Sequence, residues 1–599
     1  MNHAQIQLAR PSMAEIDRRS TRYPALDGLR CLAVVMVILF HADLPWASGG
    51  AIGVDVFFVL SGYLITGQLW SRALVRGRIE LRSFWVARAR RLFPALVVVV
   101  LATAVAMTVS GRDQLREFRG DFLAALGYVS NWWYVLHHRS YFAATGRPPV
   151  LQHLWSLAVE EQFYLVWPLV LAGILAWGTT WRARKALAMT VAFGLTAASA
   201  LWMVVGTVAA SVPYDNDGSR WYFGTDSHAF GLLLGAGLAL LRDGDQLGLP
   251  ASPGRTPRWL GLAGLAGLAV LIAAVPWLNS YRPGFYSYGL PAVSVTAVVL
   301  TAAVTRETAV ARWLSWEPLR AIGKRSYGLY LWHWPVFQFT RPGLDLALDG
   351  PALLFVRLVL VFTLTEMSYQ MIEKPLRQNG FRNTWRTLRT WRLGPVPGVA
   401  LVAFVVAVIV AATFVVRGTD SPAASAGSAS TGGAAGAVSG IAASALSVSA
   451  YGDSVMLGAV PTMKQTFGSV NADAVEGAQA AKVLNQVVAD HDSGNQAPVV
   501  VLHVGDNGLI GESRLTAALD KLRDRKRVVL MTLYVDRDWQ GINNQLISSM
   551  PAKYPNVRVA DWHGFAQAHT DLLYSDGIHL RPSAFQPYTD LVAHTATEQ

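Results

Sequence analysis

The composition of this chain excludes an ordinary soluble protein. Of its 599 residues, 52% are hydrophobic and only 15% are charged, whereas soluble domains carry about 25% charged residues. A formal net charge of +12 also fits a nucleic-acid-binding protein, but the distribution of the basic residues argues against that class. The single cysteine, Cys31, excludes an internal disulfide and a cysteine-based metal site, and we expect no metal.

Apolar stretches in the first 417 residues have the length that a bilayer core requires, roughly 20 residues. One is ALVVVVLATAVAMTV after Pro94, and another is VALVAFVVAVIVAATFVV before Arg417. About eleven candidate spans are centred near residues 35, 60, 102, 168, 197, 233, 268, 296, 334, 361 and 407. The sequence therefore predicts a tail at 1–24 and a polytopic α-helical membrane domain of about 10–11 spans over 25–417.

The basic residues fall on every second predicted loop. Residues 71–93 hold seven arginines, and further clusters follow the fourth and eighth predicted spans. The alternate loops, such as 43–50 and 278–287, hold very few basic residues. This is the positive-inside pattern of membrane proteins, so the net charge reports topology and we expect no nucleic-acid partner. The N-terminus is predicted to be cytosolic, and an odd number of spans places the C-terminus outside.

The composition changes abruptly after Arg417. Residues 418–447 are almost all small and predict a flexible Ala/Gly/Ser linker. From 448 to 599, strand-like runs alternate with helix-compatible segments such as AAKVLNQVVAD and SRLTAALDKLRD. The strand-like runs are LSVSAYG, PVVVLHVG, RVVLMTLYV and VRVADW. This alternation predicts an exported α/β domain with a parallel sheet flanked by helices.

Three polar segments follow predicted strands of this domain, where open α/β sheets place their ligand sites. Ser454 lies in a Gly-Asp-Ser turn before a helical stretch, where the helix dipole favours a developing anion. Asn507 follows a second strand and could donate to an oxyanion. Asp576 and His579 are three residues apart, so the carboxylate could orient the imidazole as a base. Each segment alone is weak, because a Gly-Asp-Ser turn is usually only a turn or helix cap.

Together and in this order, the segments resemble the sequence blocks of the SGNH hydrolases, over roughly residues 446–595. The resemblance implies a flavodoxin-like α/β fold with Ser454 as nucleophile and Asp576 and His579 completing a triad. It also implies an oxyanion hole to which Gly477 and Asn507 contribute. The Gly-x-Ser-x-Gly elbow of other α/β hydrolases is absent.

Ionisable residues inside the predicted spans point to a second site, because burying them in a bilayer is costly. Arg30 and His41 both lie in the first span. Their spacing corresponds to about three helical turns, so both project from one face about 16 Å apart. A histidine that titrates near neutral pH suits general-base catalysis. A structural role is the alternative, with Arg30 reaching the headgroups and His41 capping a carbonyl.

Further polar residues stand at the ends of other predicted spans. Arg88 and Arg91 belong to a basic cluster, which is either a topology signal or a site for the phosphates of a donor. The remaining candidates are Asp55 in GVDVFFVLSGYLI, Glu160 and Glu161 in WSLAVEEQFY, Tyr330 and His333 in SYGLYLWHWP, and Glu373 in EKPLR.

Taken together, these segments resemble the acyltransferase-3 family of membrane acyltransferases, from Leu26 to about Arg377. The resemblance rests on the Arg-x10-His spacing, the Arg-x-x-Arg pair and the three long motifs just quoted. It implies acyl transfer to carbohydrate, with acyl-CoA as a donor substrate and no tightly bound cofactor. His41 would then be the catalytic base, assisted by Arg30, and Arg88 and Arg91 would contact the donor. Asp55, Glu160, Glu161, Tyr330, His333 and Glu373 would support this membrane site.

The fusion of the two modules resembles bacterial envelope-glycan O-acetylases. It implies a multi-pass protein of the bacterial plasma membrane, with membrane lipids, acyl-CoA and an envelope glycan as partners. Because acyl-CoA cannot cross a membrane, we expect a relay. The membrane module would pass an acyl group, most simply acetyl, to Ser454 and from there to a sugar hydroxyl. The sequence does not identify the glycan.

Three alternatives stay open at this point. The membrane module could acylate the glycan itself, with the outer domain only binding glycan or editing esters. The chain could be a transporter or flippase with an attached binding domain, although this does not explain the set of Ser454, Asp576 and His579. It could also be an esterase that acts through its exported domain alone.

Overall fold

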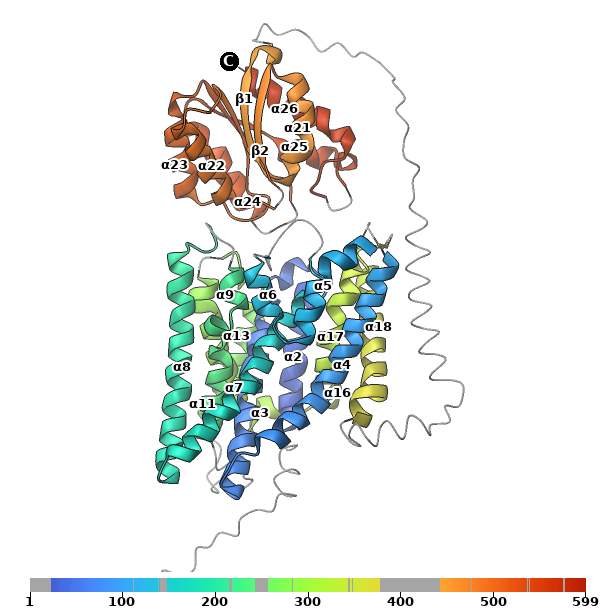
Figure 1. Ribbon diagram of the computed structural model, residues 1–599, viewed down its shortest axis with the longest axis vertical. Coiled ribbons are helices and arrows are strands. Elements are labelled where there is room, and N and C mark those ends of the chain that lie inside the picture. Colours follow the sequence, from blue (N-terminus) through green and yellow to red (C-terminus); the bar gives the residue numbers. More distant parts are fainter. Residues whose placement is uncertain are drawn as a thin grey trace, which may run out of the picture.

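The structure is a computed structural model of the chain. It describes residues 23–376 and 442–598, except for short gaps at 111, 138, 140–147, 215–217, 243–256, 283, 343–344, 347, 476, 536, 538 and 575–576. A helical domain is followed by an α/β domain, as the sequence predicts (Figure 1). Most of the predicted tail and linker lies outside the described residues.

Within the described residues of the helical domain, seven helical segments are long and apolar enough to cross a membrane. They are α2 (Pro24–His41), α3 (Gly53–Arg76), α4 (Leu81–Ser110), α7 (Trp155–Trp177), α8 (Trp181–Ala209), α14 (Leu290–Val304) with the preceding turn η4 (Phe285–Gly289), and α18 (Gly350–Ser368) with the following turn η5 (Tyr369–Glu373).

Three shorter helices fill the remaining predicted span positions: α11 (Phe230–Leu241), α13 (Arg258–Ala274) and α17 (Ser326–Gln338). The ten predicted centres from 35 to 361 each fall in a different one of these helices, which confirms the multi-span architecture. The eleventh centre, near 407, lies outside the described residues. Short helices connect the spans: α5 (Arg112–Leu126), α6 (Ser130–Leu136), α9 (Ser219–Phe223), α10 (Thr225–His228), α15 (Ala309–Leu314) and α16 (Glu317–Lys324).

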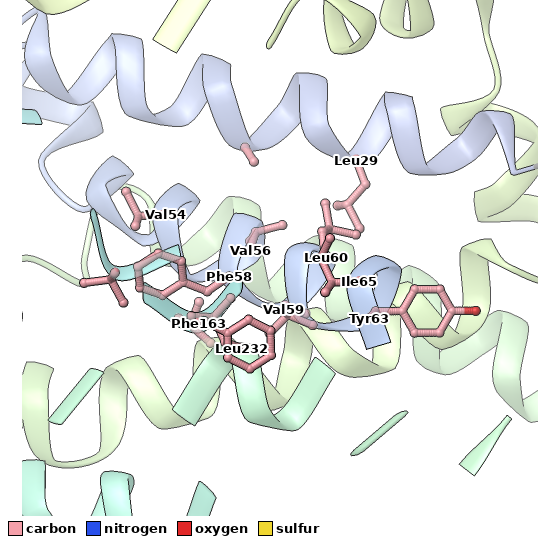
Figure 2. Close-up of a cluster of buried hydrophobic side chains, with 14 of the residues drawn as sticks. Leu29, Val54, Val56, Phe58, Val59, Leu60, Tyr63, Ile65, Phe163 and Leu232 are labelled. Carbon is pink, nitrogen blue, oxygen red and sulfur yellow. The ribbon is translucent and has the colours of Figure 1, made fainter. Parts of the chain in front are cut away.

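Helix α3 lies at the centre of the bundle, and its packing depends on glycine. Figure 2 shows its apolar side chains, including Val59, between Leu29 of α2 and Leu232 of α11. A Cβ atom at Gly62 would lie 1.8 Å from the carbonyl oxygen of Leu232. A Cβ atom at Gly235 of α11 would lie 2.1 Å from the carbonyl oxygen of Val59. Small residues therefore allow these two helices to pack backbone against backbone, as is common in membranes.

The α/β domain contains a five-stranded parallel sheet in the order β2-β1-β3-β4-β5. This is the flavodoxin-like order, so the predicted fold class is confirmed. The strands are β1 (Ser447–Gly452), β2 (Ser469–Ala474), β3 (Val499–His503), β4 (Arg527–Met531) and β5 (Val557–Ala560). Four of them coincide with the predicted runs. The sequence analysis missed β2, because this edge strand has the mixed sequence SVNADA and is only half-buried on alternate residues.

Helices cover both faces of the sheet. They are α21 (Ser454–Thr466), α22 (Ala480–Asp492), α23 (Glu512–Lys521), α24 (Gln540–Ser549), α25 (Trp562–Ala568) and α26 (Phe585–Thr597). Along β3, Val499 and Val501 pack into the core beneath α21 and α26, whereas Val500 and Leu502 pack beneath α22 and α23. Because both faces are buried, the strand is apolar throughout, as parallel strands are.

The two domains contact each other through an aromatic pair. In Figure 1 the α/β domain lies beyond one end of the helical domain, with α24 on the side facing it. Tyr281, in the loop between α13 and η4, packs against Trp539, which directly precedes α24, with ring centroids 4.2 Å apart. The Tyr281 loop is therefore at the end of the bundle next to the α/β domain.

Candidate active sites

The predicted nucleophile and base of the α/β domain meet at the carboxyl edge of the sheet. Ser454 begins α21 directly after β1, and Asp453 caps this helix by accepting a hydrogen bond from the backbone N–H of Val455 at 3.2 Å. The hydroxyl of Ser454 lies 3.0 Å from Nε2 of His579. If Ser454 donates this bond, Nε2 is ready to take the hydroxyl proton. The pair has the geometry of a base-activated nucleophile.

Backbone pairing across a short turn holds His579 in place. Its carbonyl accepts from the backbone N–H of Tyr574 at 2.8 Å, and Leu573 forms a bridge with Leu580. Gly577 has a φ of +69°, which a tight turn requires there. Asp576, the predicted third member of the triad, lies outside the described residues, so its role stays a prediction.

The predicted oxyanion residues lie on the two loops beside Ser454. Asn507 follows β3, and its side-chain amide lies 3.4 Å from Oδ2 of Asp453 and 3.3 Å from the carbonyl of Ala478. Gly477 follows β2 with a φ of +68°. Gln479 links the two loops by donating to the carbonyl of Asn507 at 2.8 Å. The order of strands therefore brings all three predicted segments to one edge.

Two unpredicted residues hold the Asn507 loop. Asn543 donates to the carbonyls of Gly505 and Gly508 at 3.1 and 2.9 Å and accepts from the N–H of Ile510 at 3.0 Å. Trp539 donates to the carbonyl of Gly505 at 2.9 Å. Gly505 has a φ of +112°, and a Cβ atom there would lie 2.8 Å from Nδ2 of Asn543. Neither residue carried a sequence signal, because both come from the segment after β4.

A buried acidic cluster lies behind the nucleophile. Burial raises the pKa of the Asp453 carboxyl to about 6. Burial and the neighbouring Asp453 raise the pKa of Asp506 well above its usual range. Nε2 of His503 lies 3.2 Å from Asp506, its Nδ1 lies 2.7 Å from the Tyr588 hydroxyl, and burial lowers its pKa to about 3. His503 is therefore neutral. At pH values where an ordinary aspartate would be ionised, Asp453 and Asp506 still hold one proton between them.

The helical domain contains a cavity of about 590 Å³. Its lining includes six residues predicted for the membrane site: Arg30, Arg88, Arg91, Glu160, Glu161 and Tyr330. Arg320 and Lys324 of α16 add two cations that the sequence analysis did not assign to a site. The cavity is lined by the first residues of α2, so it lies toward the end of the bundle away from the α/β domain.

Hydrogen bonds orient the polar residues of this cavity. Arg88 donates to Oε1 of Gln68 at 2.8 Å, and its guanidinium lies over the ring of Tyr164. The Tyr164 hydroxyl donates to Glu160 at 3.0 Å. Glu160 and Glu161 were predicted at the mouth of their span, whereas they line the cavity one to two turns inside α7. The cavity thus combines a cationic wall with carboxylates.

His41 is not among the residues that line the cavity, although Arg30 on the same helix is. It is the last residue of α2, half-buried, and its Nδ1 lies 3.0 Å from Nε2 of His333 on α17. Its ring packs against Trp334, with centroids 4.6 Å apart. The structure therefore brings together two predicted residues, His41 and His333, that are 292 positions apart in the sequence.

Asp55 and Glu373 occupy other positions. Asp55 is fully buried, and its Oδ1 lies 3.0 Å from Nε2 of His228, a residue the sequence analysis missed. The other nitrogen of His228 donates to the carbonyl of Tyr222 at 2.8 Å. The pair joins α3 to α10, and the His228 ring packs against Phe58 and Trp155. The predicted support of the membrane site by Asp55 stays a prediction. Glu373 lies in η5 beside Gly328 of α17.

Comparisons with known proteins agree with this architecture. Residues 23–366 match the family model described as an acyltransferase domain. The peptidoglycan O-acetyltransferase OatA of Listeria monocytogenes is 33% identical, covering 96% of this chain and 99% of the relative. The O-acetyltransferase OatA of Staphylococcus aureus is 32% identical, with 96% of each chain covered. The solved C-terminal catalytic domain of Streptococcus pneumoniae peptidoglycan O-acetyltransferase A covers 25% of this chain and 92% of that one, at 18% identity and a TM-score of 0.24. From the family match and the whole-length relatives, this chain belongs to the acyltransferase-3 family of membrane acyltransferases.

Proposed function

We propose that this enzyme is a peptidoglycan O-acetyltransferase that draws acetyl groups from cytosolic acetyl-CoA. The observation that carries the proposal is the 3.0 Å contact between Ser454 and His579, in a chain whose membrane domain contains a cationic cavity. A transporter has no need for an activated serine. The names of whole-length relatives in Listeria and Staphylococcus support peptidoglycan as the acceptor.

The cavity is the proposed donor site. Its volume of about 590 Å³ suits a ligand of cofactor size. Arg88, Arg91, Arg320 and Lys324 supply cations for phosphate groups, for which arginine offers paired donors. The N-terminus is proposed to be cytosolic, which opens the cavity toward the compartment that holds acetyl-CoA.

His41 is proposed as the base of the membrane step. It takes a proton from the hydroxyl of an acyl carrier as that oxygen forms a C–O bond to the acetyl carbonyl carbon, the C–S bond of the thioester breaks, and His41 returns the proton to the leaving thiolate. Tyr330 connects this position to the cavity, because it lines the cavity and lies in the same turn of α17 as His333. The acetyl group then leaves toward the outer end of α2.

Ser454 is proposed to receive the acetyl group outside the membrane. His579 takes the hydroxyl proton as Ser454 forms an ester, and it returns this proton to the departing group. A sugar hydroxyl then attacks the ester, again losing its proton to His579, and the proton finally restores the Ser454 hydroxyl. The backbone N–H of Ser454 and the amide of Asn507 are the proposed donors to the oxyanion.

The Tyr281–Trp539 contact supports a direct hand-over between the domains. Trp539 is hydrogen-bonded to the Gly505 loop that carries Asn507. On the other side, Gly49 of the loop after α2 donates to the carbonyl of Val275, at the base of the Tyr281 loop. The contact thus connects the loop that follows His41 with the loop beside Ser454.

The test is the base-labile acetyl content of purified peptidoglycan, measured by mass spectrometry in a deletion strain. The strain carries the wild-type protein, His41→Ala or Ser454→Ala. We expect both variants to lose the same ester. If Ser454→Ala keeps or raises the ester, the outer domain is accessory or hydrolytic. If neither variant changes any ester, the transferase assignment fails and the transporter alternative gains support.

A further inference from the structure

Three histidines from separate segments meet near the outer end of the bundle. His41 ends α2, His153 lies in the turn η3 (Gln152–Leu154), and His333 lies in α17. The His333 ring is 5.0 Å from that of His41 and 5.4 Å from that of His153, between centroids. His333 and His153 are both buried, at 0% and 1% exposure. The proposed chemistry uses only His41.

The contacts of His333 determine which of its nitrogens carries the proton. Its Nδ1 lies 2.8 Å from the carbonyl oxygen of Tyr330 and 3.3 Å from that of Leu329. A carbonyl oxygen only accepts, so Nδ1 must be the protonated nitrogen. A fully buried ring beside two other imidazoles is neutral, because burial disfavours the charged form. Nε2 of His333 therefore presents a lone pair.

This lone pair acts on the proton position of His41 together with the backbone of Val37, to which His41 also hydrogen-bonds. Nε2 of His333 lies 3.0 Å from Nδ1 of His41, and with one acceptor already assigned, Nδ1 of His41 must be the donor. In the neutral ring, Nε2 of His41 then carries the lone pair. We propose that His333 is a positioning residue that holds His41 in this tautomer and orientation, with Nε2 as the basic atom.

The proposal deepens the function proposed above and rests on it, since it assumes that His41 acts as a base. His333 takes the position that the carboxylate takes in a Ser-His-Asp triad. It differs in being neutral, so it directs the His41 ring without placing a second charge in the apolar interior. The rings of Phe40 and Trp334, with centroids 5.0 and 4.6 Å from that of His41, limit the remaining motion.

The link also couples His41 to the cavity. The carbonyl that fixes His333 belongs to Tyr330, whose hydroxyl bonds Ser156 Oγ at 2.6 Å and the carbonyl of His153 at 2.8 Å. Tyr330 and Ser156 both line the cavity. The orientation of His41 is thus set by residues that also contact the proposed donor site.

The test compares His333→Leu with His333→Gln in the full chain, purified and placed in lipid nanodiscs with acetyl-CoA. Leucine removes the acceptor at similar volume, whereas the glutamine amide oxygen can still accept from Nδ1 of His41. We expect leucine to lower kcat for acetyl transfer about 10–100-fold, the range seen when a group that orients a metal-bound histidine is lost, with KM for acetyl-CoA unchanged. Glutamine should retain most of the wild-type rate. Equal losses in both variants, or none in leucine, would overturn the proposal.

A second measurement reads the tautomer directly. In ¹⁵N-histidine-labelled protein, the His41 signals are assigned by their absence in His41→Ala. Solid-state NMR should show protonated Nδ1 and unprotonated Nε2 in the wild type and in His333→Gln, with the opposite tautomer gaining population in His333→Leu. A wild-type His41 protonated on Nε2 would refute the positioning role even if His41 is essential. An active His41→Ala would instead refute the base role while leaving the tautomer result standing.

Discussion

The helical domain and the α/β domain each place a histidine within hydrogen-bond distance of a second polar side chain, but in contrasting surroundings. His579 lies half-buried on a turn at a sheet edge and faces the Ser454 hydroxyl. His41 ends a membrane helix and contacts the fully buried His333. In a membrane interior, polar groups must find partners within the protein, whereas an exposed edge leaves them open to water.

The largest expected effect separates the chemistry of the two domains. His579→Ala should lower acetyl transfer to glycan by about 10³-fold or more, because the serine loses its base. Binding of acetyl-CoA should not change, since the cavity lies in the other domain. Isothermal titration of the purified full chain with acetyl-CoA measures the binding, and analysis of acetyl groups on the glycan measures the transfer. A variant that also loses acetyl-CoA binding would show that the sites are not separable.

The α/β domain should show a pH dependence of stability that originates at the acidic cluster. The pKa of Asp453 is raised from 3.8 in the unfolded chain to about 6 in the folded domain. Its contribution to the free energy of unfolding is therefore fully present below pH 4 and is lost as the pH rises through 6. The loss is about 3 kcal/mol at 1.36 kcal/mol per pKa unit. Asp453→Asn removes the buried carboxyl that must ionise above pH 6 and should therefore stabilise the domain at pH 7.5.

Thermal unfolding of the full chain, followed by tryptophan fluorescence at pH 4.5 and pH 7.5, checks this prediction. The variant should melt higher than the wild type at pH 7.5 and nearly equally at pH 4.5. Asp571→Asn, at an exposed position, is the matched control. An equal shift at both pH values would mean that ionisation of the buried Asp453 carboxyl is not the cause.

A smaller effect is expected at the donor cavity. Arg88→Ala removes one charge-assisted donor, worth about 1.5–3 kcal/mol, and should weaken acetyl-CoA binding about tenfold or more. Arg88→Lys should recover only part of the affinity, because lysine lacks the planar paired donors. Hydrolysis of a small soluble ester at Ser454 serves as the control and should be unaffected. Unchanged acetyl-CoA affinity in Arg88→Ala would place the donor elsewhere.

The contact between the domains should have the smallest effect. Tyr281→Ala removes the ring that packs on Trp539 and should lower transfer to glycan a few-fold, because aromatic pairs contribute about 0.5–1.5 kcal/mol. Tyr281→Phe keeps the ring and should behave as wild type. Acetyl content of the peptidoglycan measures both. If phenylalanine is as impaired as alanine, the hydroxyl matters and the packing explanation is wrong.

Local patterns were sufficient for much of the architecture. The apolar runs located ten described helices and four of five strands, because burial on all sides requires apolar residues throughout. The polar segments around Ser454 and Asn507 were recognisable because each follows a strand, whereas the prediction that His579 also stands at a strand end was wrong, because α25 and η9 separate it from β5. β2 escaped detection since an edge strand needs no apolar run. Asp55 was recognised as unusual, but its partner His228 was not.

What the sequence by itself determined was therefore the number of modules, the order of their elements and the residues with unusual chemistry for their place. Only the tertiary structure decided which of these residues meet. It paired His41 with His333, placed Arg30 in a cavity away from His41, and brought Asn543 and Trp539 beneath the Asn507 loop. The pattern of apolar and polar residues along one helix or strand indicates whether each residue is buried or exposed. Contacts across hundreds of positions depend on how the elements pack, which no local pattern contains.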